Sequence, residues 1–293
     1  MNDEGYSPRL SARTLVVSLC FLWSLFQLYV ASVVPFVLTE WTGLSLVFNN
    51  QEIRQIHLAF ALVLAMLAYP LKKNPSQPRT LWYDYAAALV AAASCLYLLV
   101  FKDQISDRAG LPTVSDLWVS AIGLLALALA LYRCLGFPLL IVCSFFLFYV
   151  FFGDESFMPE TVQWKGASLN KALWHFWMQT EGVFGVALGV ASSMIFLFVL
   201  FGALLEKAGA GIYFIRLAYA LLGHMRGGPA KAAVVASGLS GIYSGSSIAN
   251  VVSTGTFTIP LMKKTGLTPE KAGAVEVAAS TNGQLTPPVM GAA

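Results

Sequence analysis

An apolar stretch between Arg226 and Lys264 is interrupted near its middle by a short run of serine and glycine. This interruption constrains the fold more than any other feature of the chain. A helix that crosses a bilayer needs about 20 consecutive apolar residues. The apolar pieces on the two sides, 232–243 and 248–261, are each too short to cross, and basic residues flank the whole stretch. The pattern predicts a re-entrant helical hairpin over 230–264 that enters and leaves the membrane by one face.

The serine and glycine residues 244–247 would form the tip of this hairpin. In hydrocarbon, unwound backbone is tolerated only where protein or a water-lined cavity satisfies its hydrogen bonds. We therefore expect the tip to lie inside the protein and to carry its function.

The composition of the chain is that of a polytopic membrane protein. Of its 293 residues, 57% are hydrophobic and 11% are charged, which predicts an all-α fold of helices in a lipid bilayer. The net charge of +3 is small and spread over the loops, so no nucleic-acid partner is expected. The segments that we expect to span or enter the membrane are 14–38, 56–71, 81–101, 117–132, 138–152, 183–205 and 212–222.

Basic residues are distributed unevenly over the loops between these segments. Arg13, Lys72, Arg133 and Lys207 fall on alternate loops and therefore on one side of the membrane. Because lysine and arginine in short loops favour the cytoplasmic side, we expect the amino terminus in the cytoplasm. No small-residue cleavage site follows the first apolar segment, which indicates a retained span and not a signal peptide.

The character of the chain changes near Arg133. Residues 1–133 are predicted to form four antiparallel helices with short loops and little polarity within the membrane. In residues 168–179, Leu169 and Trp177 share one helical face and charged and polar side chains share another. This pattern predicts an amphipathic helix in the outer interface. We therefore divide the chain into regions 1–133 and 134–293.

A second discontinuity follows the hairpin. Residues 268–270 form a helix start, with a capping hydroxyl, proline at the first helical position and an acid in the first turn. The predicted helix ends near Thr281, because the glycine and two prolines of 282–288 cannot continue it. Thirteen or so helical residues advance only ~20 Å of the ~30 Å hydrocarbon core. Residues 269–293 are therefore expected to form a broken helix, and the chain to be the amino-terminal part of a longer protein.

The two interruptions place oxygen-rich helix ends inside the membrane. A helix ends in exposed carbonyl groups and about half a negative charge. Carbonyl, hydroxyl and amide oxygens are hard donors, which suit a small alkali cation such as Na⁺ better than a transition metal. The side-chain donors at the two interruptions are the hydroxyls of Ser244, Ser246, Ser247 and Thr281 and the amide oxygen of Asn250 or Asn282.

Two further features concern ligands. The amino end of the second hairpin arm, near 248–251, offers free backbone N–H groups, which favour an anion such as a substrate carboxylate. Paired interruptions of this kind point to a secondary-transporter site near the bilayer midplane. Glu276 lies among small apolar residues of the following helix, and a carboxylate within the membrane is a functional-site candidate. Two roles stay open for it: exchange of a coupling ion or proton, or holding the hydroxyl groups of its neighbours.

Two stretches resemble a known family. SGIYSGSSIANVVSTGTFTIPLMKKTG (240–266) and AGAVEVAASTNGQLTPPVMGA (272–292) are similar to the large membrane subunit of tripartite ATP-independent periplasmic (TRAP) transporters. The similarity is greatest to the fused permeases that work with TAXI-type solute-binding proteins, and it covers residues 180–293. The first four predicted helices resemble the small subunit of that family by number and position only.

The resemblance implies sodium-driven uptake of small organic anions, delivered by a periplasmic binding protein, through an elevator-type movement in a bacterial or archaeal cytoplasmic membrane. It implies a second, inverted half beyond this chain and no cofactor other than the coupling ion. This sequence has Asn282 where the family is expected to have glycine and Thr286 where it has an apolar residue. Together with the donor chemistry above, the resemblance predicts that sodium is bound by Ser244, Ser246, Asn250, Thr281 and Gly283 and the substrate by Ser247, Asn250, Asn282 and Gln284. Ion coupling stays one of the two open roles for Glu276.

Other interpretations differ from this one in specific features. An elevator-type sodium/carboxylate carrier that needs no binding protein would lack region 1–133 and the outer amphipathic helix. A channel or a non-transporting structural subunit is a further alternative, but a channel would show a continuous polar pore face, which no predicted span has. An enzyme is not expected, because the chain has no motif such as His-Glu-x-x-His and Glu276 alone is insufficient.

Overall fold

The computed structural model describes residues 10–71, 81–108, 110–155, 158–244 and 247–286. Within these ranges the regular structure is helical and no strand is assigned, so the predicted all-α fold is confirmed. The chain divides into two compact units, Met1–Gly189 and Val190–Ala293, and each is considered by itself below.

Helices long and apolar enough to cross a membrane confirm the polytopic class. Five are found in the described part of the chain: Arg13–Ala31, Asn50–Ala68, Trp82–Val100, Val114–Leu135 and Val186–Lys207. Two shorter apolar helices, Phe137–Phe152 and Ala210–Leu222, occupy the other predicted segments.

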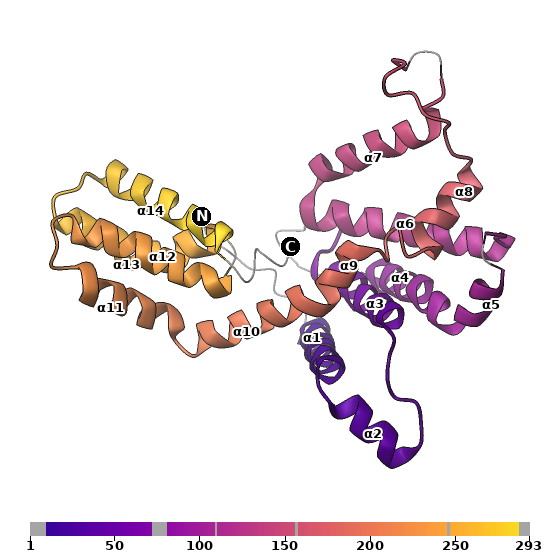
Figure 1. Cartoon of the computed structure of the whole chain (residues 1–293), viewed down its shortest axis with the longest axis horizontal. Helices are drawn as coiled ribbons and strands as arrows, with labels where there is room; N and C mark the ends of the chain where they lie inside the picture. The colour runs from indigo at the N-terminus through magenta and orange to yellow at the C-terminus, as the bar shows by residue number, and fades with distance from the viewer. Residues whose placement is uncertain (1–9, 72–80, 109, 156–157, 245–246, 287–293) are drawn as a thin grey trace. The chain divides into compact units, whose positions relative to one another are not determined.

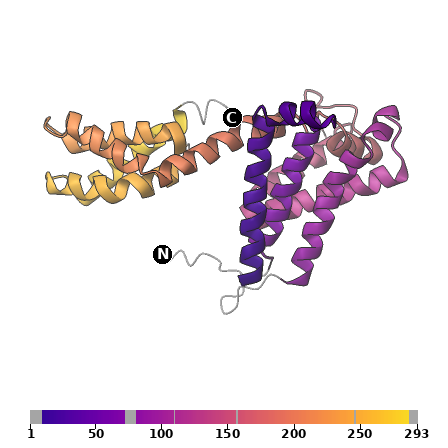
Figure 2. The ribbon, with the colours of Figure 1, turned by 90° about the horizontal axis from the view of Figure 1, so that it is seen from below.

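The first unit is built around three long helices. α3 packs along α4, both pack against α6, and α1 lies beside α3; Figure 1 labels these helices and Figure 2 shows α1, in indigo, from a second side. The elements are α1 (Leu10–Ala31), α2 (Val34–Thr42), α3 (Asn50–Ala68), α4 (Trp82–Val100), α5 (Lys102–Asp107), α6 (Val114–Leu135), α7 (Phe137–Phe152), α8 (Leu169–Leu173) and the π-helical turn η1 (Trp174–Met178). The short helix α9 (Val186–Val190) follows, and the boundary between the two units falls within it.

The first predicted span is divided in the structure. The sequence predicts one helix over 14–38, but α1 ends at Ala31 and α2 begins at Val34. Pro35 lies in the first turn of α2, where its missing N–H costs nothing, whereas inside a continuous helix it would remove a hydrogen bond. The proline therefore begins a second helix and does not extend the first.

α3 begins six residues before the predicted start at Ile56, and its amino-terminal cap explains the difference. The Asn49 side chain accepts from the backbone N–H of Gln51 at 2.9 Å and of Glu52 at 2.8 Å. Glu52 in turn accepts from the backbone N–H of Asn49 at 2.9 Å. This capping box satisfies N–H groups that have no partner within the helix, so a polar first turn is stable ahead of the apolar part.

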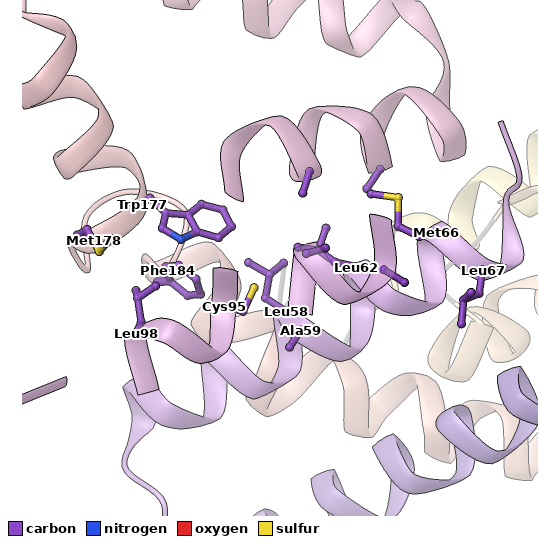
Figure 3. Packing of buried hydrophobic residues seen from close by; sticks show 14 of the residues in the cluster. Leu58, Ala59, Leu62, Met66, Leu67, Cys95, Leu98, Trp177, Met178 and Phe184 are labelled. Atoms are coloured by element: carbon purple, nitrogen blue, oxygen red, sulfur yellow. The ribbon is translucent and has the colours of Figure 1, made fainter. Parts of the chain in front are cut away.

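The core of the first unit gathers side chains from α3, α4, α6 and η1 (Figure 3). Trp177 and Phe184 meet edge to face, with ring centroids 5.3 Å apart, and Met66 and Cys95 are fully buried. Gly123 of α6 makes room for the indole, because a Cβ there would lie 2.2 Å from Cε2 of Trp177. The core therefore depends on a residue without a side chain at the α6 contact.

The predicted amphipathic helix over 168–179 is helical in the structure, as α8 and η1. Its buried face differs from the prediction: Trp174, Trp177 and Met178 are buried, whereas Leu169 is 61% exposed. The buried residues share one face at i, i+3 and i+4 spacing, and that face packs against α6. Packing against a neighbouring helix, and not hydrophobicity alone, decides which aromatic side chains turn inward. A position in the outer interface stays a prediction.

Residues 1–133 contain buried polar contacts between helices. Nη1 of Arg133 donates to Oδ1 of Asp84 at 2.7 Å, and the two side chains are 2% and 0% exposed. The same nitrogen lies 2.9 Å from the main-chain oxygen of Met66, near the carboxyl end of α3. Gln27 and His57 form a second buried contact, 2.5 Å between Nε2 and Nδ1. The prediction of little polarity within the membrane stays a prediction. The partners in these buried contacts are far apart in the chain, so only the fold pairs them.

The second unit contains the predicted hairpin and the helix that follows it. η2 (Ala191–Ile195) and α10 (Phe196–Lys207) lead to α11 (Ala210–Leu222), α12 (Gly228–Ser244), α13 (Ser247–Lys264) and α14 (Pro269–Leu285). α12 packs against α11, α13 and α14, and α13 packs against α14; Figure 1 shows these helices in orange and yellow. Gly209 and Gly266 connect successive helices at φ values of 88° and 96°, which glycine adopts without strain.

The compact units do not coincide with the regions predicted from the sequence. The structural division lies at Gly189, because α8 and η1 pack against α6 and so join the amino-terminal helices. The predicted division at Arg133 concerns similarity to two subunits of a family. It stays a prediction, since packing within one chain does not test it.

Candidate cation and substrate site at the helical hairpin

The two predicted arms of the hairpin are α12 and α13, which pack against each other. The tip residues 245–246 lie outside the described residues. α12 ends at Ser244 and α13 begins at Ser247, so a helix carboxyl end and a helix amino end face the same short connection. Entry of this connection into a membrane from one side stays a prediction.

α14 begins as predicted but ends later. The hydroxyl of Thr268 accepts from the backbone N–H of Lys271 at 3.4 Å, and Pro269 is the first helical residue. The helix continues past Thr281 to Leu285, so the predicted end near Thr281 was wrong. The extra turn stops before a pair of prolines, and a residue that precedes proline is disfavoured in the helical conformation. The rest of the predicted broken helix, 287–293, lies outside the described residues.

A close approach of α12 and α14 explains why the helix tolerates Gly283. A Cβ on Gly241 would lie 2.5 Å from Cα of Gly283. A Cβ on Gly283 would lie 2.8 Å from Nδ2 of Asn250. The two glycines therefore allow α12, α13 and α14 to meet at one point, and this point lies next to Asn250.

Asn250 is the central polar residue of this contact. It is fully buried in the first turn of α13. Its Nδ2 donates to the main-chain oxygen of Ser237 at 3.0 Å and to Oγ of Ser237 at 2.7 Å. Because a main-chain carbonyl can only accept, the amide nitrogen must face α12. The amide oxygen points elsewhere and has no hydrogen-bond partner in the described part of the chain.

Ser240 supplies a second buried oxygen without a partner. Its side chain is 1% exposed, and Oγ makes no hydrogen bond within the described residues. Ser237 and Ser240 are three residues apart and so lie on the same face of α12. Buried polar atoms almost always have a partner. Asn250 Oδ1 and Ser240 Oγ are therefore two unused acceptors of the kind that suits a hard cation.

Side chains that would hold a transition metal are not grouped in the structure. Among the residues that it describes, no three His, Cys, Asp or Glu side chains lie close enough together to hold a metal ion. The predicted binding of sodium stays a prediction.

Glu276 of α14 is fully buried against α13. Its Oε1 accepts from Thr254 and its Oε2 from Thr258, each at 2.5 Å. Ser280, one turn further along α14, is 3.4 Å from Oε1. Gly255 faces the carboxylate side chain, since a Cβ there would lie 3.2 Å from Cγ of Glu276. The hydroxyl groups hold Glu276 in one position between two helices.

A cavity of about 300 Å³ borders this carboxylate cluster within the second unit. Glu206, Ser253, Thr254 and Phe257 are among the residues that line it. Because Thr254 also binds Glu276, the cluster lies next to a space large enough for water or a small ion.

The structure brings some of the predicted site residues together and separates others. Asn250 and Gly283 are in contact, and Ser247 is half-buried at the start of α13. Thr281, Asn282 and Gln284 lie on the exposed side of α14, where Thr281 Oγ1 donates to the main-chain oxygen of Val277 at 3.0 Å. Ser244 ends α12, with a side chain outside the described set, and Ser246 is not among the described residues. The assignments to sodium and substrate all stay predictions.

Several polar residues that surround Asn250 and Glu276 were not predicted from the sequence. A helical repeat of small polar residues would have found them, because they recur at three- and four-residue spacing on the inner faces of three helices. They are Ser237 and Ser240 on α12, Thr254 and Thr258 on α13, and Ser280 on α14.

Comparison with known families concerns the second part of the chain. Residues 122–293 match the family model described as "Tripartite ATP-independent periplasmic transporter, DctM component". This match covers more than half of the chain and includes the hairpin and α14. No solved structure matches this chain.

Curated relatives match over a shorter stretch. A C4-dicarboxylate TRAP transporter large permease protein, DctM, of Vibrio cholerae is 41% identical over 91 residues, which are 31% of this chain and 20% of that protein. The protein of the same name in Pseudomonas aeruginosa is 38% identical over 91 residues, 31% of this chain and 21% of the relative. An uncharacterized protein, YgiK, of Salmonella typhimurium is 34% identical over 91 residues, with 31% and 21% covered. The chain therefore spans about a fifth of the length of the curated relatives it matches.

Proposed function

This chain belongs to the DctM component family of tripartite ATP-independent periplasmic transporters, and from that membership we propose that it is a membrane permease component of a sodium-coupled secondary transporter. The family is one of transporters, so the expectation that the chain is not an enzyme is confirmed. The proposed solute is a small organic anion, and the proposed partner is a periplasmic solute-binding protein of the TAXI type. We place the protein in a bacterial or archaeal cytoplasmic membrane with its amino terminus in the cytoplasm.

The observation that carries sodium coupling is the pair of unused acceptors beside the hairpin. Asn250 Oδ1 and Ser240 Oγ are buried without a partner among the described residues, and Ser240 directly precedes Gly241, which approaches Gly283 of α14. The carboxyl end of α12 at Ser244 adds carbonyl groups with a partial negative charge. Sodium would be bound by these oxygens, and it would supply the driving force by moving down its gradient together with the solute.

The solute class is supported by the chemistry of α13 and by two relatives. The amino end of α13, at Ser247, carries N–H groups without helical acceptors, and such an end favours an anion. The relatives from Vibrio cholerae and Pseudomonas aeruginosa are named as C4-dicarboxylate permeases. A carboxylate solute next to a sodium ion would also reduce the charge that each ligand brings into the membrane.

Uptake by the full-length protein in proteoliposomes tests this proposal. We expect labelled organic anion to accumulate only when a sodium gradient and the cognate TAXI-type binding protein are both present. Accumulation that ignores sodium would contradict the coupling. Uptake without the binding protein would favour the alternative carrier that works alone.

Substitutions at the site sharpen the same test. Asn250→Ala and Ser246→Ala should each weaken sodium affinity while insertion into the membrane is preserved. Thr256→Ala is the control, because Thr256 is exposed on the same helix and its hydroxyl donates, among the described residues, to the main-chain oxygen of Ser253 alone. Equal sodium dependence in Asn250→Ala and Thr256→Ala would remove Asn250 from the site.

A further inference from the structure

Glu276 is a buried carboxylate whose side-chain hydrogen bonds, among the described residues, are all with hydroxyl groups. Thr254 and Thr258 each donate to one of its two oxygens, and Ser280 lies near Oε1. The ion pairs found among the described residues, Lys102–Glu52, Arg108–Asp116 and Arg133–Asp84, all lie in the first unit. A buried charge is costly unless an opposite charge accompanies it. Within the described part of its own unit, Glu276 has hydrogen-bond donors but no cation.

The candidate cation site beside Asn250 has, among the described residues, acceptor oxygens but no negatively charged side chain of its own. Its unused acceptors, Asn250 Oδ1 and Ser240 Oγ, are neutral, and so are the carbonyl groups at the end of α12. A cation bound there would bring a full positive charge into a region of low dielectric constant, where neutral oxygens compensate it only in part. A negative charge close by would therefore stabilise a bound cation, whether or not the solute is present.

Two links connect Glu276 to Asn250: a hydroxyl group that lies within hydrogen-bond distance of both, and a chain of hydrogen bonds. In the first, Thr254 Oγ1 lies 2.5 Å from Glu276 Oε1 and 2.7 Å from the main-chain oxygen of Asn250. In the second, Ser280 Oγ is 3.4 Å from Glu276 and 3.4 Å from Ser237 Oγ, and Ser237 accepts from Asn250 Nδ2 at 2.7 Å. In this second link Asn250 donates to Ser237, Ser237 donates to Ser280, and Ser280 donates to the carboxylate. The amide oxygen of Asn250 takes no part in this chain and stays available as an acceptor.

We infer that Glu276 is the counter-charge of the sodium site and a positioning residue for Asn250, without being a ligand of the ion. Its two oxygens already accept from threonine hydroxyls at 2.5 Å, and Ser280 lies 3.4 Å from Oε1, so hydroxyl groups occupy three of the roughly four acceptor positions of the carboxylate. Its negative charge instead stabilises sodium two hydrogen bonds away. The inference rests on the proposed function, because it assigns a role at the same sodium site.

Two further titratable side chains, a tyrosine and a glutamate, lie on elements that neighbour the Glu276 cluster. Tyr219 of α11 is close enough to interact electrostatically with Glu276, and Glu206 lines the cavity that reaches Thr254. Neither brings a positive charge to the cluster.

Sodium affinity of the purified full-length protein, measured by calorimetry, tests the inference. Glu276→Gln keeps the size of the side chain and removes its charge. We expect on the order of tenfold to a hundredfold weaker sodium binding, the effect of one charge at two hydrogen bonds' distance with an effective dielectric constant of ~20. If Glu276 served only in packing, Glu276→Gln would change the free energy of unfolding but not the affinity for sodium.

Two threonines provide a matched pair for the same measurement. Thr254→Val and Thr258→Val each remove one hydroxyl from Glu276, one turn apart on α13. Only Thr254 also contacts Asn250, at its main-chain oxygen, 2.7 Å away; Thr258 bonds to the main-chain oxygen of Thr254 instead. We expect Thr254→Val to weaken sodium binding several-fold more than Thr258→Val.

The outcomes separate this inference from the proposed function. If the parent binds sodium and Glu276→Gln binds it equally well, the counter-charge is disproved and sodium coupling survives. If Glu276→Gln does not fold, equal affinities of Thr254→Val and Thr258→Val disprove the link to Asn250. If the parent shows no sodium binding at all, the proposed sodium coupling fails and the counter-charge fails with it.

Discussion

Gly241 of α12 and Gly283 of α14 meet backbone to backbone. A Cβ on Gly241 would lie 2.5 Å from Cα of Gly283 and 2.9 Å from its main-chain oxygen. This contact sets how closely the hairpin approaches α14, and Asn250 lies directly beside it. The geometry of the candidate cation site therefore depends on two positions that carry no side chain.

Gly241→Ala should separate α12 from α14. The added methyl group cannot fit against the backbone of Gly283, so we expect a loss of about 1–3 kcal/mol, the usual cost of overpacking. The measurement is the free energy of unfolding of the full-length protein in detergent.

Gly238→Ala is the control for that change. Gly238 lies on the same helix and a Cβ there meets nothing within 4 Å, so the substitution should be neutral or stabilise the helix by up to about 1 kcal/mol. Equal losses for Gly238→Ala and Gly241→Ala would show that the close approach to Gly283 does not matter.

Asp84→Asn should destabilise the first unit strongly. It leaves the buried guanidinium of Arg133, 2% exposed, without its carboxylate partner 2.7 Å away. Removing one member of a buried ion pair costs about 3–5 kcal/mol. Chemical unfolding followed by tryptophan fluorescence measures this loss.

Glu52→Gln is the matched surface variant. Glu52 pairs with Lys102 at the same distance, 2.7 Å, but Lys102 is 51% exposed, and exposed pairs contribute about 0.2–1 kcal/mol. A loss for Asp84→Asn no larger than that for Glu52→Gln would contradict the claim that burial decides the value of the pair.

Gly123→Ala should displace the Trp177 indole. The new Cβ would lie 2.2 Å from two atoms of the ring, so η1 must move away from α6. We expect a red-shifted tryptophan emission and a loss of about 1–3 kcal/mol. Leu125→Ala on the same helix, at a side chain that is 70% exposed, should leave the emission unchanged. An unshifted spectrum in Gly123→Ala would place the indole elsewhere.

Asn49→Ala should fray the start of α3. The substitution removes the acceptor for the backbone N–H groups of Gln51 and Glu52, a loss of about 1 kcal/mol. Hydrogen exchange of the first turn of α3 measures the change. Asn50→Ala is the control, because Asn50 is exposed and is not the capping residue. Equal hydrogen-exchange rates in Asn49→Ala and Asn50→Ala would show that the Asn49 cap does not stabilise the first turn of α3.

Local signals in the sequence were sufficient for the helices but not for all of their ends. Hydropathy located the five long apolar helices, and the capping pattern at Thr268 and Pro269 located the start of α14. The end of α14 was misplaced because Gly283 indicated a break, whereas in the structure it serves contact with Gly241. A glycine that breaks a helix in isolation can be retained within one when a neighbouring backbone packs against it.

By itself, the sequence determined the all-α membrane class, the two hairpin arms and the polar character of their connection, because each follows from residues close together in the chain. Only the tertiary structure decided that Asp84 pairs with Arg133, that Ser237 binds Asn250, and that Thr254 and Thr258 hold Glu276. Hydrogen bonds and ion pairs act over a few ångströms and between groups from different helices. Their partners are therefore set by how the helices pack, which no local pattern of residues specifies.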